Sequence, residues 1–192
     1  MANTMLDGLK ERIYKSAQIH QSVGVIVPVS NYMDLFETIM MQMLGSKQDL
    51  WMYVSITKTY DTIIKSYREF ANKPNIFFID CISRAAGISQ KADNCCFIES
   101  PVMLERILME MMHAFRERKT EGNTYIVLDS LSALMIYNNV ETVKEFFQHF
   151  VNKTRAENIH CVSVVIEEEM DDHLNKIIFL NEKIIKVKES FI

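Results

Sequence analysis

With 192 residues, 48% of them hydrophobic and 24% charged, the chain is large enough for one domain with a substantial hydrophobic core. The net charge of -4, without a Lys/Arg cluster interleaved with aromatic residues, argues against a nucleic-acid partner. No apolar run approaches the roughly 20 residues that span a bilayer, and the N-terminus lacks the apolar core of a signal peptide. We therefore expect a cytoplasmic protein with no membrane partner.

The four cysteines are expected to be free thiols, because disulfides are rare in the cytoplasm. Cys95 and Cys96 are adjacent in the chain and so lack the spacing of a metal-binding pair. We predict no metal site.

The first half of the chain alternates helical patterns with short apolar runs. An amphipathic helix is predicted within residues 1–22, ahead of a single domain at 23–192. Gly45 is expected to end the next helix, and the polar stretch 83–94 to form a flexible loop. The pattern predicts strands at 23–28, 50–56, 76–82 and 95–98.

In the second half, Ser100 followed by Pro101 predicts a helix start, since serine can cap and proline suits the first helical position. A buried strand follows in 124–134, then a helix whose inward residues run from Val140 to Val151. Further strands are predicted at 159–166 and 183–188.

Short apolar strands that alternate with helices predict an α/β fold. Parallel strands need a crossover connection, usually a helix, so we expect a three-layer α/β/α sandwich with a mostly parallel central sheet.

The segment TYIVLDSLSAL, residues 124–134, resembles the Walker B segment of the RecA superfamily in its KaiC-like and RadA-like forms. In those ATPases the aspartate, here Asp129, helps to hold magnesium. The segments YVSITKTY, FFIDCIS and FIESP agree with the same family in order and spacing, so the resemblance runs from about Val23 to Lys188. It implies a RecA/KaiC-like core of the P-loop NTPase type.

The phosphate loop of that family is missing. Its form G-x-x-x-x-G-K-[ST] cradles phosphates with backbone amides, whereas this chain has PVSNYMDLFETI. The glycine, lysine and threonine positions fall at about Asp34, Leu35 and Phe36. A carboxylate there would repel a triphosphate, and a loop without glycine cannot readily wrap an anion.

A second catalytic element is also missing. KaiC-like ATPases typically follow the second strand with two glutamates, one of which activates water; Thr57 and Lys58 stand at those positions. Neither side chain can act as a carboxylate base at neutral pH. The chain is thus identified as a phosphate-loop-less, archaeal-type relative of KaiC, for which we predict no catalytic residue and no cofactor.

Several polar residues are candidates for a small-ligand site at the carboxyl edge of the sheet. Asp129, Ser130, Lys58 and Arg84 are the candidate ligand contacts, and Asp80 and Ser83 could line the same crevice. The alternative for each is a helix cap or an ordinary hydrogen bond.

The acidic stretch EEEMDD, with His173 after it, suggests a cation site, but a solvated loop is favoured because neighbouring like charges repel.

Two functional hypotheses follow. The first is a catalytically inactive KaiC-like domain that acts as a protein-interaction or regulatory module and associates with itself. The second is a sensor that binds a nucleotide or another small molecule at the carboxyl edge without hydrolysis. Residual activity at an unrecognised site is a third possibility.

Overall fold

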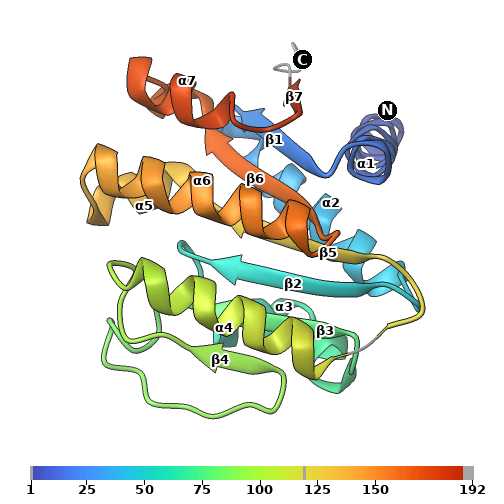
Figure 1. Ribbon diagram of the computed structural model, residues 1–192. Helices are drawn as coiled ribbons and strands as arrows, with labels where there is room; N and C mark the ends of the chain where they lie inside the picture. The colour runs from blue at the N-terminus through green and yellow to red at the C-terminus, as the bar shows by residue number, and fades with distance from the viewer. Residues whose placement is uncertain (1, 119, 188–192) are drawn as a thin grey trace.

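The structure is a computed structural model that describes residues 2–118 and 120–187. Its centre is a seven-stranded sheet in the order β4-β3-β2-β5-β6-β1-β7 (Figure 1), and every neighbouring pair is parallel. The strands are β1 Ser22–Val27, β2 Leu50–Ser55, β3 Ile76–Asp80, β4 Cys95–Phe97, β5 Thr124–Asp129, β6 His160–Ile166 and β7 Lys183–Lys186. The helices are α1 Ala2–Ile19, α2 Tyr32–Gly45, α3 Tyr60–Ser66, α4 Leu104–Glu117, α5 Leu131–Tyr137, α6 Val140–Ala156 and α7 Asp172–Ile178.

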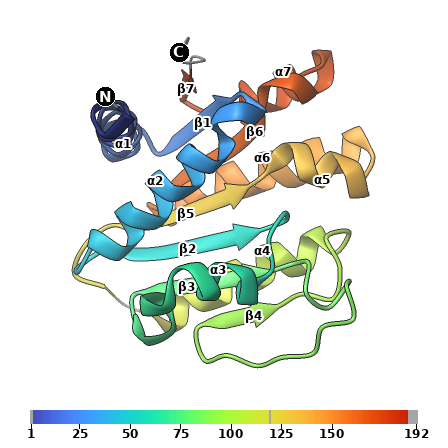
Figure 2. The same ribbon diagram turned by 180° about the vertical axis from the view of Figure 1, so that it is seen from behind.

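Helices cover both faces of the sheet. Figure 2 shows α1, α2 and α3 on one face, and Figure 1 shows α4 to α7 on the other. Each helix layer shares an apolar core with the sheet, for example Ala17 and Met40 with Val127 on the first face, and Ile107 and Phe147 with Leu128 on the second. The predicted three-layer α/β/α sandwich is confirmed.

The central strands are buried along nearly their whole length because both of their faces are covered. All six residues of β2 are buried, as are the last five of β5, so neither strand shows the polar alternation of a half-exposed sheet. Each side chain of these strands points into one of the two cores, and the last residues of the strands bring polar groups to the carboxyl edge.

Several helix boundaries differ from those predicted. The helix after Pro101 begins three residues later, at Leu104, because Ser100 and Pro101 form a turn in which Met103 donates its backbone N–H to the Ser100 carbonyl oxygen at 3.0 Å. Within the segment 124–134, the last residues leave the strand and enter α5, which the sequence pattern did not predict. Residues 172–178 form α7, where we had assigned no element. Lys188 lies outside the described residues.

The connections reverse direction at the centre of the sheet. From β2 the chain continues to β3 through α3, on the face of α1 and α2. From β5 it continues the opposite way to β6, through α5 and α6 on the other face. In open α/β sheets, ligands bind outside the carboxyl ends of strands at such a switch point, here the ends of β2 and β5. No helix among the described residues is both long and apolar enough to cross a membrane.

Candidate functional site

Asp129 ends β5 at this switch point and is almost completely buried, with 2% of its surface exposed. Its Oδ2 atom accepts hydrogen bonds from two phenols, those of Tyr32 at 2.5 Å and of Tyr53. Tyr53 comes from the middle of β2 and Tyr32 is the first residue of α2, so three elements meet at one oxygen. The peptide bond between Asp129 and Ser130 is cis.

Lys58 completes the cluster from the segment between β2 and α3. Its Nζ donates to the Tyr32 hydroxyl at 2.7 Å and lies 4.1 Å from the Tyr32 ring centroid and 4.6 Å from that of Phe36. The Thr57 hydroxyl is 3.1 Å from the Tyr32 hydroxyl. Tyr32 therefore links the half-buried ammonium to the buried carboxylate, and both rings favour the positive charge.

Burial dominates the electrostatics of this cluster. It raises the pKa of Asp129, although the donors from Tyr32 and Tyr53 and the Lys58 charge act to lower it. Burial also lowers the pKa of Lys58, against the attraction of Asp129. The phenol pKa values of Tyr32 and Tyr53 are raised by burial and then by the Asp129 charge. Both tyrosines remain neutral donors at physiological pH.

One oxygen of the cluster has no partner. The Oδ1 atom of Asp129 is buried and accepts no hydrogen bond from the described residues, while Oδ2 accepts two. An unpartnered buried acceptor costs roughly 1–3 kcal/mol, so Oδ1 is the place where a ligand's donor would gain most.

Asp80 and Ser83, which were predicted to line a crevice, belong to a closed network instead. The Asp80 carboxylate accepts from the backbone N–H groups of Ile82 and Ser83, each at 2.8 Å, and of Tyr60 at 2.6 Å. The Ser83 hydroxyl adds a fourth bond at 2.6 Å. These bonds join the end of β3 to the start of α3, which leaves Asp80 no free acceptor for a ligand.

The remaining candidate contacts are placed differently from one another. Arg84 is exposed on the loop after β3 and pairs with Glu99 at 2.6 Å. The Ser130 hydroxyl caps α5 by accepting from the N–H of Ala133 at 3.1 Å. The structure thus brings Lys58 and Asp129 together, while Ser130 and Arg84 already have protein partners.

The segment between β1 and α2 is closed by a carboxylate of the chain itself. After β1, a single 3-10 turn, Val29–Asn31, leads into α2, whose first turn carries Asp34. The N–H of Val29 donates to both carboxylate oxygens of Glu168, at 3.0 and 2.9 Å. A protein carboxylate therefore lies on the turn where phosphate-loop proteins hold an anion.

Two further residues of the acidic stretch also have structural partners. Glu167 pairs with Lys186 at 2.5 Å, and Asp171 caps α7 by accepting from the N–H of Leu174 at 2.7 Å. Across the residues that the structure describes, no group of three or more His, Cys, Asp or Glu side chains could hold a metal ion.

Cys95 and Cys96 belong to the cores on opposite faces of β4, and burial raises the pKa of Cys96 to about 11.

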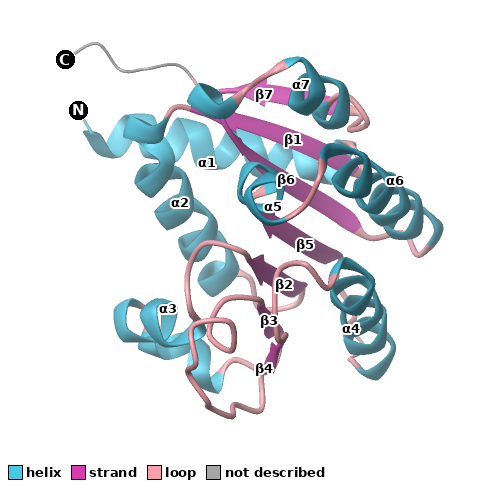
Figure 3. Cartoon of the chain, turned by 90° about the vertical axis from the view of Figure 1, so that its left-hand side faces the viewer, coloured by secondary structure: helices cyan, strands magenta, loops and turns pink. Residues whose placement is uncertain are grey.

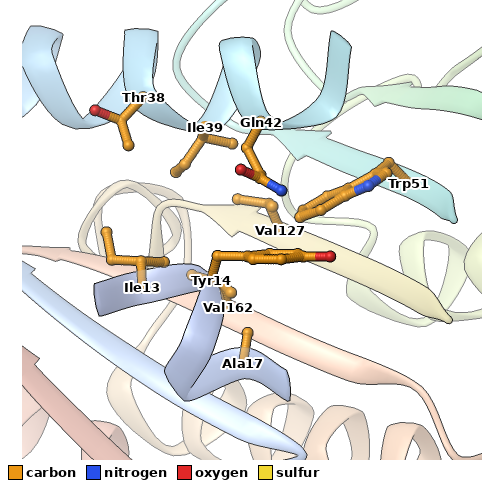
Figure 4. Close-up of a pocket in the computed structure, with 9 residues that line it drawn as sticks. All are labelled: Ile13, Tyr14, Ala17, Thr38, Ile39, Gln42, Trp51, Val127 and Val162. Atoms are coloured by element: carbon orange, nitrogen blue, oxygen red, sulfur yellow. The ribbon is translucent and has the colours of Figure 1, made fainter. Parts of the chain in front are cut away.

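A separate cavity of about 20 Å³ lies between α1, α2 and the sheet (Figure 4). Its lining is formed by Ile13, Tyr14, Ala17, Thr38, Ile39, Gln42, Trp51, Val127 and Val162. The space suffices for about one water molecule, but the lining is mostly apolar, so we interpret it as a packing defect under α1.

Sequence reasoning missed both tyrosines of the Asp129 cluster. Tyr53 lies within an apolar strand and resembles a core residue, and Tyr32 opens a helix whose inward face is apolar. The signal that could have found Tyr32 is its place at the start of α2, directly after the turn Val29–Asn31.

Comparison of the sequence with models of known protein families and with curated proteins gave no match.

Proposed function

We propose that this chain is a catalytically inactive, RecA/KaiC-like domain that serves as a protein-interaction or regulatory module and associates with itself. The observation that carries the proposal is that its own side chains fill both places where an active relative would bind nucleotide and metal. Glu168 lies on the turn before α2, and Tyr32 and Tyr53 bind the Asp129 carboxylate.

The chemistry of these contacts opposes nucleotide binding. A triphosphate at the start of α2 would meet the carboxylates of Glu168 and Asp34, which repel it. On Asp129, a magnesium ion could bind only the buried Oδ1 without breaking the two hydrogen bonds to Oδ2, and the nearby Lys58 charge would repel it there.

An interaction role is supported by the distribution of exposed apolar side chains. Among the described residues, seven large ones lie within eight residues after the carboxyl end of a strand. We call this set the apolar rim: Val29, Met33, Ile88, Val102, Met103, Ile136 and Tyr137. Apolar side chains gathered on one edge of a folded chain mark a protein interface more often than scattered ones do.

The test is isothermal titration of ATP with Mg²⁺ into the natural chain and into Asp129→Asn, with a parallel assay for phosphate release. We expect neither binding heat nor turnover at millimolar ATP. Saturable binding by the natural chain that disappears in Asp129→Asn would overturn the inactive-domain proposal and favour a nucleotide sensor.

A ligand sensor is the second candidate, and the unpartnered Oδ1 of Asp129 favours it. A small molecule with a hydrogen-bond donor for Oδ1 and an acceptor for Lys58 would fit the chemistry of this edge. Thermal-shift screening of nucleotides and metabolites tests it, since a ligand at 100 times its dissociation constant adds roughly 2.7 kcal/mol of stability. A true ligand of this site should lose its effect in Lys58→Gln.

A further inference from the structure

The centre of the carboxyl edge is the tip of α5. Figure 3 looks onto this edge and shows α5 between α7 on one side and α3 on the other. Ile136 at the tip is 72% exposed, and Tyr137 beside it is also exposed. Side chains of this kind usually gain free energy when a partner covers them.

Part of the apolar rim is continuous with this tip. The side-chain amide of Asn138, directly after α5, donates to the Pro101 carbonyl oxygen at 3.3 Å. This bond places the turn that carries the exposed Val102 and Met103 beside the end of α5, where Ile136 and Tyr137 are exposed.

The two sides of α5 differ in charge. Towards α7, the segment 167–172 carries exposed carboxylates. Within this segment, Glu167 forms an ion pair with Lys186. Towards α3 lie the cations Lys58 and Arg84. Each of these cations has a carboxylate nearby, Glu99 paired with Arg84 and the buried Asp129 close to Lys58, so this end is close to neutral. The edge therefore has an acidic end and a cation-bearing end, with an apolar centre between them.

We propose that two copies of the chain associate carboxyl edge to carboxyl edge, about a two-fold axis that is perpendicular to the sheet and passes between the two α5 tips. Ile136 and Tyr137 of both copies then form the buried centre. The acidic segment 167–172 of each copy faces Lys58 and Arg84 of the other. This inference rests on the proposed function, whose self-association it makes specific.

Electrostatics selects this axis over the other two-fold arrangement. An axis along the sheet edge would place the acidic ends against each other, in a chain whose net charge is already -4. The perpendicular axis removes that repulsion and places each acidic segment opposite Lys58 and Arg84, at both ends of an isologous interface. The apolar centre supplies most of the affinity and the charges set the orientation.

The first test is the mass of the protein in solution, measured by sedimentation velocity over a concentration series. We expect a dimer in the micromolar range for the natural chain, and for Ile136→Lys a dissociation constant raised by at least about tenfold. The matched control is Phe179→Lys at the end of α7, because Phe179 is 70% exposed but lies outside the apolar rim. That variant should dimerise like the natural chain.

The second test exchanges charges between the two ends. One variant carries Arg84→Glu, and the other carries both Glu169→Lys and Asp172→Lys. Each variant by itself should dimerise more weakly than the natural chain, because like charges then face each other. Mixing the two should restore a heterodimer, since both end contacts become attractive again.

The proposal would be overturned if the natural chain stayed monomeric at millimolar concentration. It would also be overturned if Ile136→Lys did not weaken the dimer, or if mixing the two charge variants gave no heterodimer. The ATP titration reads the inactive-domain proposal separately. If the protein is a monomer and binds no ATP, only the proposal of a carboxyl-edge dimer is refuted. If it is a dimer and binds ATP, only the proposal of an inactive domain is refuted.

Discussion

At Asp129, burial and hydrogen bonding act on one carboxyl group in opposite directions. Removal from water disfavours the charged form of Asp129, whereas the hydrogen bonds from Tyr32 and Tyr53 and the charge of Lys58 stabilise it. The effect of burial is larger, so the pKa of Asp129 is raised. In the unfolded chain the same carboxyl group should titrate near its ordinary pKa of about 4. Between these two pKa values the folded state binds more protons than the unfolded state.

Folding stability should therefore fall as the pH rises through this window. The stabilising effect of a protonated Asp129 is complete below the unfolded pKa and is lost as the pH rises through the folded pKa. Asp129→Asn keeps acceptors for both tyrosines but cannot titrate. We expect this variant to gain stability relative to the natural chain as the pH rises above about 4.

Urea unfolding of both proteins at a series of pH values measures this difference. Other titrating groups cancel in the comparison, because both proteins carry them. A stability difference that stays constant from acid to neutral pH would contradict the raised pKa of Asp129.

At the scale of elements, α1 packs on α2 and on the sheet, and a small cavity lies within this contact. Ile13 and Ala17 are buried beneath it, and both line the cavity together with Trp51 of β2 (Figure 4). Trp51 is the single tryptophan of the chain and is 4% exposed. Its fluorescence can therefore report whether α1 is seated.

We predict that Ala17→Asp separates α1 from the sheet, because a buried carboxylate without a partner costs several kcal/mol. The unfolding free energy should drop by about 3 kcal/mol and the Trp51 emission should shift to longer wavelength. Gln18→Asp, one residue further along the helix and exposed, is the matched control and should leave both properties nearly unchanged. Equal emission spectra for the two variants would refute this account of α1 docking.

The elements of the sheet could be predicted because a doubly covered strand needs a continuous apolar run, as in β2 and β5. Helix starts were harder to predict, since they depend on which of several neighbouring polar groups forms the local hydrogen bonds. Ser100 carried the expected capping signal, yet its carbonyl oxygen joins a turn and α4 begins at Leu104. Ser130, read as a ligand contact, is the cap of α5.

The candidate site could be predicted only in part, for a similar reason. Asp129 ends one buried strand and Lys58 follows shortly after another, so the pattern placed both at the carboxyl edge. Tyr32 joins them through contacts that span 97 and 26 positions in the chain. Nothing in local spacing encodes such a contact, which exists because α2 returns its first residue to the ends of β2 and β5.

At the scale of the whole molecule, one sheet carries two separate cores. Phe147 of α6 is fully buried in the core of the second face, while Trp51 belongs to the core of the first face. The two cores share every central strand, since alternate residues of each strand enter opposite cores. Damage to one core should therefore reach the other through the sheet.

We predict that Phe147→Ala lowers the stability of both faces together, by about 4 kcal/mol, as expected for a large residue removed from a closely packed core. During urea unfolding, Trp51 fluorescence reports the loss of packing on the first face, and far-ultraviolet circular dichroism reports the loss of all helices. In the natural chain and in the variant, the two signals should change at the same urea concentration, because the two cores share the strands of one sheet and should unfold in one cooperative step. If Trp51 kept its natural midpoint in Phe147→Ala while the helical signal was lost earlier, the two layers would be independent folding units. A partner bound on one face could then not influence the other through the sheet.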